Sequence, residues 1–304
     1  MKGRVVDARI SVVIPTFNRQ DTIVDAIKTA LDQTLAPIEV IVVDDCSTDA
    51  TVERVRAYSD SRVVLISQPK NMGGGAARNA GILAAKGDWV ALLDSDDLWR
   101  ADKLELQSRA IENARDAICY SNLEFFGGDA GRPYWNLRPL RNGEPLADYM
   151  IAEGQAVQTS SLYMYKQTAV SILFDERLRR HQDWDFVLRA EREGMHFVYI
   201  DLPLVLYRMS DSESVSRNAN VSATLDWMDW AGDILTARHR SIIGLDVIVP
   251  RIAGRDFWGA AGLILKAIGN GVVEPRRLLR ASLELLPPPV TQPLKRVIRK
   301  FRRA

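Results

Sequence analysis

The chain has 304 residues, of which 47% are hydrophobic and 26% are charged, and its formal net charge is +1. This composition is typical of a globular protein with a sizeable core. It also excludes proteins that bind nucleic acid through a large positive charge, so we expect no nucleic acid as a partner. The two cysteines, Cys46 and Cys119, lack metal-type spacing. We therefore expect reduced thiols, as in a cytoplasmic protein.

The first hundred residues alternate between short β-branched runs and helical patterns. Strands are expected at 10–14, 39–43, 63–66 and 89–93, and helices at 22–31, 51–58 and 76–85. Alternation of this kind predicts an α/β fold with a doubly wound, mostly parallel sheet that is covered by helices on both faces.

The rest of the chain has a less regular pattern. Extended segments are expected at 117–126, 160–165, 196–200 and 204–207, with helices at 184–192, 223–238, 253–268 and 276–285. Because the pattern turns helical near residue 221, we place an α/β domain at 1–218 and a helical C-terminal extension at 219–304.

Polar clusters follow each of the four expected strands of the first hundred residues. They lie at 15–19, 44–45, 71–75 and 94–97. In open α/β sheets the ligand crevice lies outside the carboxyl ends of the strands, so these four clusters should converge on one site.

The fourth cluster holds three carboxylates within four residues, Asp94, Asp96 and Asp97, directly after an apolar run. Carboxylates that are crowded at the end of a buried strand repel one another and need a positive partner. The Asp-x-Asp spacing provides hard oxygen ligands that suit Mg²⁺ or Mn²⁺. The alternative is an acidic loop that caps the following helix.

The third cluster, Gly73–Gly75, precedes a helix and allows the backbone to approach a phosphate closely, with Arg78 as an added cation. A dinucleotide-binding fingerprint is excluded because Arg78 stands where the third glycine is needed. The alternative is a plain tight turn.

Four motifs occur in order along the chain: VVIPTFNR (12–19), VVDDCSTD (42–49), NMGGGAARNAG (71–81) and LDSDD (93–97). Together they resemble glycosyltransferase family 2, the inverting nucleotide-sugar enzymes of GT-A fold. The resemblance extends more weakly to about residue 216 and does not cover the C-terminal helices.

The resemblance implies a site for the nucleotide-sugar donor that is built from all four motifs. Its residues are Pro15, Thr16, Asn18, Asp45, Gly75, Arg78, Asp94 and Ser95. It places Asp45 at the base or ribose and Arg78 on the phosphate side. It also implies that Asp94 and Asp96 hold Mn²⁺ or Mg²⁺, with Asp96 nearest the metal.

A later segment, HQDWDFVLR (181–189), resembles the family segment that carries the general base. The resemblance implies that Asp183 is this catalytic base, and that His181, Gln182 and Trp184 lie on the acceptor side. The alternative for Asp183 is a helix N-cap. The chain departs from the family pattern at Gln182, where Glu is usual, and at Ser210, where many relatives carry His.

The predicted function is that of an inverting, metal-dependent glycosyltransferase. It would move a sugar from a nucleotide sugar, expected to be a UDP-sugar, to a hydroxyl of a glycan or lipid-linked acceptor in polysaccharide or cell-envelope glycan synthesis. One alternative is a sugar nucleotidyltransferase, although that class normally has a Gly-rich basic loop after the first strand. A second is a non-catalytic nucleotide-binding scaffold, which Gln182 and Ser210 slightly favour.

The C-terminal tail carries six cations and no anion in its last ten residues, and Leu294, Val297, Ile298 and Phe301 recur at helical spacing. A basic amphipathic helix of this kind predicts a peripheral membrane contact through 290–304. The alternative is a solvated chain end. The N-terminus lacks the apolar segment of a signal peptide, and no apolar stretch reaches the ~18 residues of a membrane span. We expect a cytoplasmic protein, or one peripheral on the cytoplasmic face of the membrane.

Overall fold

The computed structural model describes residues 8–112, 114–127, 137–209, 221–271 and 274–286. The chain divides into two compact units. The first comprises 1–146 and 155–215, and the second comprises 147–154 and 216–304. The predicted domain boundary at 218/219, Ser210 and the tail at 290–304 lie outside the described residues.

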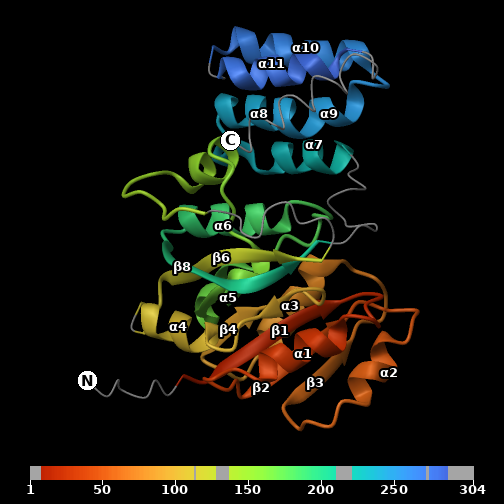
Figure 1. Cartoon of the computed structure of the whole chain (residues 1–304), viewed down its shortest axis with the longest axis vertical. Coiled ribbons are helices and arrows are strands. Elements are labelled where there is room, and N and C mark those ends of the chain that lie inside the picture. The colour runs from red at the N-terminus through yellow and green to blue at the C-terminus, as the bar shows by residue number, and fades with distance from the viewer. Residues whose placement is uncertain (1–7, 113, 128–136, 210–220, 272–273, 287–304) are drawn as a thin grey trace. The chain divides into compact units, whose positions relative to one another are not determined.

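The first unit is built on one eight-stranded mixed sheet with strand order β3-β2-β1-β4-β7-β6-β8-β5 (Figure 1). Four of its strand pairs are parallel and three, all involving β5 or β7, are antiparallel. The strands are β1 (Ile10–Thr16), β2 (Glu39–Asp44), β3 (Val63–Ser67), β4 (Trp89–Leu92), β5 (Leu98–Trp99), β6 (Ala117–Phe126), β7 (Tyr163–Tyr165) and β8 (His196–Arg208).

Helices cover both faces of this sheet. The helices of the first unit are α1 (Ile23–Leu31), α2 (Thr51–Arg56), α3 (Gly74–Ala84), α4 (Lys103–Ala110), α5 (Lys166–Ile172) and α6 (Gln182–Arg192). Along β1, Val12 and Ile14 belong to the core cluster that includes the buried side of α1. Val13, which points to the opposite face, packs against Gly81 of α3. This alternation confirms the predicted α/β class with helices on both faces.

Several elements of the first unit differ from the prediction. The two extended segments expected at 196–200 and 204–207 form one strand, β8, whose pairing with β6 shifts register near Asn122 and Pro203. The pattern did not predict β5, α4 or α5, which are short and weakly periodic.

The second unit is helical. It contains two π-helical turns, η1 (Asp148–Ala152) and η4 (Gly244–Ile248), the 3₁₀ turn η3 (Gly232–Ile234) and the helices α7 (Val221–Trp230), α8 (Ala237–Ile243), α9 (Val249–Ile252), α10 (Phe257–Gly269) and α11 (Pro275–Glu284). None of the described helices is long and apolar enough to cross a membrane.

The prediction of a single helix at 223–238 is wrong. The chain leaves the helix after Trp230 and takes a left-handed turn at Gly232 (φ 54°). Helix α8 then starts at Ala237, after the N-cap residue Thr236, whose side chain accepts a hydrogen bond from the His239 N–H. The helix predicted to start at 253 begins only at Phe257, because the Asp256 side chain caps it through the Gly259 N–H at 2.8 Å.

Helix α3 lies unusually close to the sheet at Gly81. A Cβ atom at this position would overlap the Val13 side chain and approach Val43 to 3.2 Å. Gly81→Ala should therefore lower the free energy of unfolding of the first unit by about 1–3 kcal/mol, because the strand cannot move away without loss of packing. Urea unfolding followed by circular dichroism measures this. Leu83→Ala on the exposed side of α3 is the control and should change stability by less than about 0.5 kcal/mol.

Candidate active site

The loops that follow β1 and β2 are tied together by Asn18. Its N–H donates to Ser47 Oγ at 2.9 Å, and its Oδ1 accepts from the Thr48 N–H at 2.8 Å. Asn18 has a left-handed backbone (φ 51°), to which asparagine is better suited than most residues. Pro15 and Thr16 end β1 beside these loops. Asn18, which is predicted to contact the nucleotide-sugar donor, thus also fixes the conformation of the loop after β1.

Asp45 orders the glycine loop before α3. Its two carboxylate oxygens accept the N–H groups of Met72 and Gly73, each at 2.7 Å. Gly73 has φ 95°, and a Cβ there would overlap the guanidinium of Arg179. Gly75, one residue into α3, lies against the 174–182 segment, where a Cβ would be 3.6 Å from Gln182 Nε2. Asp45, which is predicted to contact the nucleobase or ribose, therefore also fixes the conformation of the start of α3.

Arg78 joins the strand loops to α6. Its Nη2 donates to Asp94 Oδ1 at 2.6 Å and its Nη1 donates to Gln182 Oε1 at 2.8 Å. The guanidinium also lies over the Phe174 ring, 5.3 Å from its centroid. Arg78, which is predicted to lie on the phosphate side, therefore connects the predicted metal ligand Asp94 with α6, the helix that carries the predicted general base Asp183.

Three buried polar atoms at this edge of the sheet have no hydrogen-bond partner among the described residues. They are Thr16 Oγ1 at the end of β1, Gln68 Oε1 after β3 and Arg78 Nε. Buried polar atoms are nearly always paired, with protein, water or ligand. Their unused hydrogen-bonding capacity indicates a place that a polar ligand or water fills.

Asp97 is the structural member of the carboxylate cluster. Its Oδ2 accepts from Ser160 Oγ at 2.6 Å and Gln158 Nε2 at 3.1 Å, and its Oδ1 accepts from the Arg208 N–H at 3.0 Å. Burial, followed by the negative charges of Asp94 and Asp96, raises the pKa of Asp97 well above its usual value. These bonds fix the loop after β4 and occupy the oxygens of Asp97. Asp94 and Asp96 are therefore the carboxylates that remain for a ligand.

Asp94 and Asp96 have different partners. Asp94 pairs with Arg78, and its N–H donates to Ser160 Oγ at 3.0 Å. Among the described residues, Asp96 forms a longer ion pair, with Arg19 at 3.5 Å, and the positive charge of Arg208 also acts on it. Burial and the charge of Asp94 raise the pKa of Asp96. Ser95, between them, is buried. Asp96 is thus the less compensated of the pair.

The chemistry of this donor set fits a divalent cation. The two carboxylates offer hard oxygens of the kind that Mn²⁺ and Mg²⁺ prefer. Within the described part of the chain, no group of three or more His, Cys, Asp or Glu side chains is arranged to hold a metal ion. A cation at Asp94 and Asp96 would take its other ligands from water and phosphate oxygens, as Mg²⁺ usually does at phosphate sites.

Asp183 lies in the first turn of α6. The N-cap residue of this helix is His181, not Asp183, and its backbone is left-handed (φ 59°). Asp183 Oδ1 accepts from the Trp184 N–H at 3.0 Å. Burial raises the pKa of Asp183, while that hydrogen bond and the positive charge of Arg78 act in the opposite direction. The ring centroids of His181 and Trp184 lie 5.0 Å apart.

The hydroxyl pKa of Tyr207, in β8, is influenced by four carboxylates of this region. Burial raises the pKa of its hydroxyl, and the negative charges of Asp97, Asp94, Asp96 and Asp183 raise it further. Arg78 bonds both Asp94 and Gln182, and Gln182 directly precedes Asp183 at the start of α6, so these carboxylates lie in one region. The structure therefore brings the acidic cluster and the predicted base together.

Sequence reasoning missed several residues of this site. They are Gln158, Ser160, Arg179, Tyr207 and Arg208, together with the pairing of Arg19 to Asp96. Apart from Arg19, which directly follows a predicted loop residue, they come from the later part of the chain. No spacing pattern identifies them, since their contacts depend on how β7, α6 and β8 pack beside β4.

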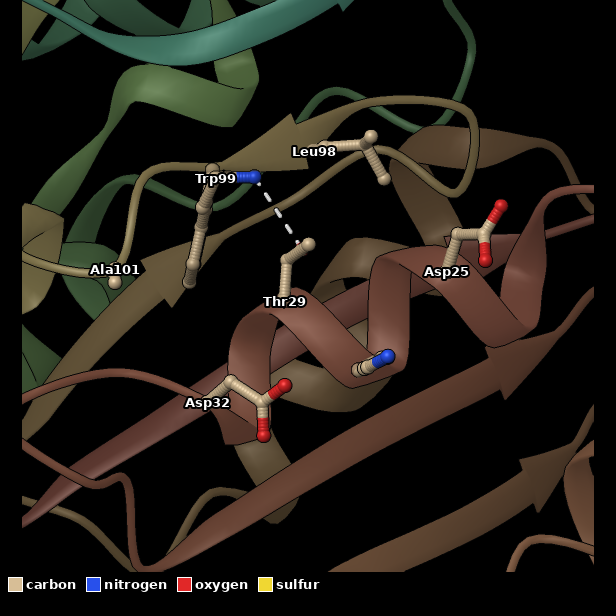
Figure 2. Close-up of a pocket in the computed structure, with 7 residues that line it drawn as sticks. Asp25, Thr29, Asp32, Leu98, Trp99 and Ala101 are labelled. Carbon is tan, nitrogen blue, oxygen red and sulfur yellow. Dashed lines mark hydrogen bonds between the residues drawn. The ribbon is translucent and has the colours of Figure 1, made fainter.

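A separate pocket lies outside this site. Its volume is about 410 Å³, and it is lined by Asp25, Lys28, Thr29, Asp32, Leu98, Trp99 and Ala101. Figure 2 shows it between one side of α1 and the 98–101 segment, where the Trp99 N–H donates to Thr29 Oγ1 at 3.3 Å. None of the predicted site residues lines this pocket.

Comparisons with known proteins agree with the geometry. The model of the family described as Glycosyl transferase family 2 matches residues 11–174. The amylovoran biosynthesis glycosyltransferase AmsB of Erwinia amylovora is 34% identical over 242 residues, which cover 76% of this chain and 80% of that protein.

Two further similarities bear on the fold and the reaction class. The UDP-Glc:alpha-D-GlcNAc-diphosphoundecaprenol beta-1,3-glucosyltransferase WfgD of Escherichia coli is 36% identical over 124 residues, or 41% of this chain and 49% of that protein. The crystal structure of S. aureus TarS 1-349 in complex with UDP-GlcNAc is 20% identical, with a TM-score of 0.65 over 91% of this chain and 88% of that one.

The TarS similarity confirms the predicted GT-A fold, and the family match confirms the resemblance of the four motifs. The relatives are glycosyltransferases, which favours neither a sugar nucleotidyltransferase nor a non-catalytic scaffold. The chain belongs to glycosyl transferase family 2 and is a glycosyltransferase.

Proposed function

We propose that this glycosyltransferase moves a sugar from a UDP-sugar to a hydroxyl of a lipid-linked glycan during cell-envelope polysaccharide synthesis, with inversion at the anomeric carbon. The names of its relatives support the pathway and the acceptor, since one makes amylovoran and another acts on a diphosphoundecaprenol-linked sugar. The TarS complex supports a UDP-sugar donor. The observation that carries the proposal is Arg78, which bonds both Asp94 and Gln182, the neighbour of Asp183.

We place the donor diphosphate between the start of α3 and the loop after β4. The first turn of α3, which has no side-chain cap, contributes backbone N–H groups and the positive end of the helix dipole after Gly73, whose own N–H is bonded to Asp45. Arg78 and Arg19 add positive charge beside Asp94 and Asp96. The unpaired Thr16 Oγ1 and Gln68 Oε1 offer polar contacts for the nucleoside part.

Asp94 and Asp96 would hold Mn²⁺ or Mg²⁺. When bound, the cation supplies Lewis-acid neutralisation of the leaving diphosphate. Asp97 would not bind it, because its oxygens already accept three hydrogen bonds from Ser160, Gln158 and Arg208. Its role is to hold the loop in place.

Asp183 would act as the general base. Its carboxylate takes the proton of the acceptor hydroxyl, whose oxygen forms a bond to the anomeric carbon. The bond from that carbon to the diphosphate breaks on the opposite side, and the electron pair leaves with the diphosphate, so the configuration inverts. The raised pKa makes Asp183 a stronger base than an ordinary aspartate. Gln182, Trp184 and His181 are its neighbours on the acceptor side.

Asp183→Asn should lower kcat by about 10²–10⁴-fold, because the amide cannot accept the proton. The Kd for the UDP-sugar should change little, since Asp183 lies on the acceptor side. Radiolabelled transfer and isothermal titration calorimetry measure the two effects. Glu193→Gln, at the exposed C-terminal end of the same helix, should leave both unchanged. Normal turnover of Asp183→Asn would rule out the assigned role.

The activity should depend on pH through Asp183. A base works only when deprotonated, so kcat/KM should decrease as pH falls through its pKa, and the raised pKa moves this decrease above the range of an ordinary carboxyl. In Arg78→Gln the loss of the nearby positive charge should raise the pKa further and shift the acidic limb of the pH–rate profile to higher pH. An acidic limb that stays in place would contradict this coupling.

Removal of divalent metal with EDTA should abolish transfer, and added Mn²⁺ should restore it. Asp96→Asn should raise the Mn²⁺ concentration needed for half-maximal rate by about tenfold or more, because one anionic oxygen ligand is lost. Asp88→Asn, an exposed aspartate before β4, is the matched control and should behave as the wild type. Full activity in EDTA would show that the proposed metal is not used.

A further inference from the structure

The outermost helices of the second unit expose large apolar side chains. On α10, Trp258, Leu265 and Ile268 are 81%, 67% and 53% exposed, and on α11 Leu279 is 63% exposed. The opposite side of α10 is buried in the core of the second unit. Apart from Lys266, helix α10 carries no charge. A helix that is apolar on all sides is normally covered on all sides, so the exposed side of α10 is a candidate contact surface.

The exposed sides of the two helices form one surface. Helices α10 and α11 pack against each other, and both pack against η4 and α9. In Figure 1 they lie side by side as the last layer of the helical unit. Their exposed side chains therefore point away from the same underlying helices. We call Trp258, Leu265, Ile268 and Leu279 the outer apolar surface.

Cations border the outer apolar surface. Lys266, Arg276 and Arg280 are exposed, and none of them forms an ion pair with another described residue. The nearby Glu274 pairs with Arg277 at 3.4 Å. The sequence then continues into 287–304, which carries six more cations and no acid. Two acids also lie on these helices, Asp256 at the N-cap of α10 and Glu284 on α11, but the exposed cations Lys266, Arg276 and Arg280 outnumber them. Apolar side chains bordered by a net positive charge match a surface that is apolar inside and anionic outside.

We propose that the outer apolar surface docks on an anionic phospholipid bilayer. Trp258, Leu265, Ile268 and Leu279 would enter the boundary between headgroups and acyl chains, where tryptophan is favoured. Lys266, Arg276 and Arg280 would meet the lipid phosphates. The proposal deepens the proposed function, on which its purpose rests, because a lipid-linked acceptor is reached only at the membrane.

Charge favours a bilayer over the other occupants. A second copy of the chain on this surface would bring the same three cations into opposition across a symmetric interface, which is unfavourable. The segment 287–304 would add its cations to those of Arg276 and Arg280. An anionic bilayer instead compensates all of them.

Vesicle flotation with the full chain tests the proposal. The protein should float with vesicles of phosphatidylcholine and phosphatidylglycerol (3:1), bind pure phosphatidylcholine vesicles much less, and lose binding as salt rises from 0.1 to 0.5 M. Leu265→Ser with Ile268→Ser should lower the partition coefficient tenfold or more, because buried apolar area is lost. Arg276→Gln with Arg280→Gln should lower it severalfold. Leu83→Ser, an exposed leucine of α3 (56%), is the control and should bind as the wild type.

Several results would overturn the proposal. One is equal binding by Leu265→Ser/Ile268→Ser and the wild type. Another is a chain ending at residue 286 that no longer binds although the Leu265→Ser/Ile268→Ser variant still does, which would assign the contact to 287–304. A wild-type dimer that this variant converts to monomer in sedimentation velocity would assign the surface to a second copy. Turnover of the UDP-sugar with a water-soluble acceptor should be the same in all variants. If the wild type did not turn over the UDP-sugar with this acceptor, that result would count against the proposed function and not against the membrane contact.

Discussion

The organisation of the site follows from the crowding of carboxylates at the end of β4. Asp94, Asp96 and Asp97 lie within four residues, and Asp183 comes close to them from α6. Each group is stabilised in a different way. Asp97 is buried among hydrogen-bond donors, Asp94 pairs with Arg78 at 2.6 Å, and Asp96 has a longer 3.5 Å ion pair with Arg19, with the charge of Arg208 also acting on it. The negative charge of Asp96, which is the least compensated of the three, would suit a cation at this edge of the sheet, and the cation would in turn attract a diphosphate.

Arg78 links the loop after β4 with α6. It is nearly buried, and its guanidinium bonds Asp94, in the proposed donor site, and Gln182, on the proposed acceptor side. Where family relatives usually carry Glu, Gln182 offers a neutral oxygen to this guanidinium. The positive charge of Arg78 also lowers the pKa of Asp183. In the proposed mechanism, the same side chain therefore contributes to donor binding and to the base strength of Asp183.

The sequence predicted the elements whose pattern is local. The strands β1 to β4 and the loops after them follow from the alternation of apolar runs and helices, and the structure places their polar residues at one edge. The partners of these residues could not be predicted in the same way. Ser160, Gln158 and Arg208 reach Asp97 only because β7 and β8 add to the sheet with mixed direction and an irregular register. The break after Trp230 was missed because the helical pattern continues through Gly232.

The proposed mechanism requires that Asp96, with Asp94, anchors a cation that carries the diphosphate of the donor. Anomalous diffraction from crystals grown with Mn²⁺ and UDP tests it directly. We expect one strong manganese peak about 2.0–2.3 Å from an Asp96 oxygen, with diphosphate oxygens among the other ligands and Arg19 displaced from Asp96. A manganese and UDP position away from the end of β4, with Asp96 still paired to Arg19, would contradict it.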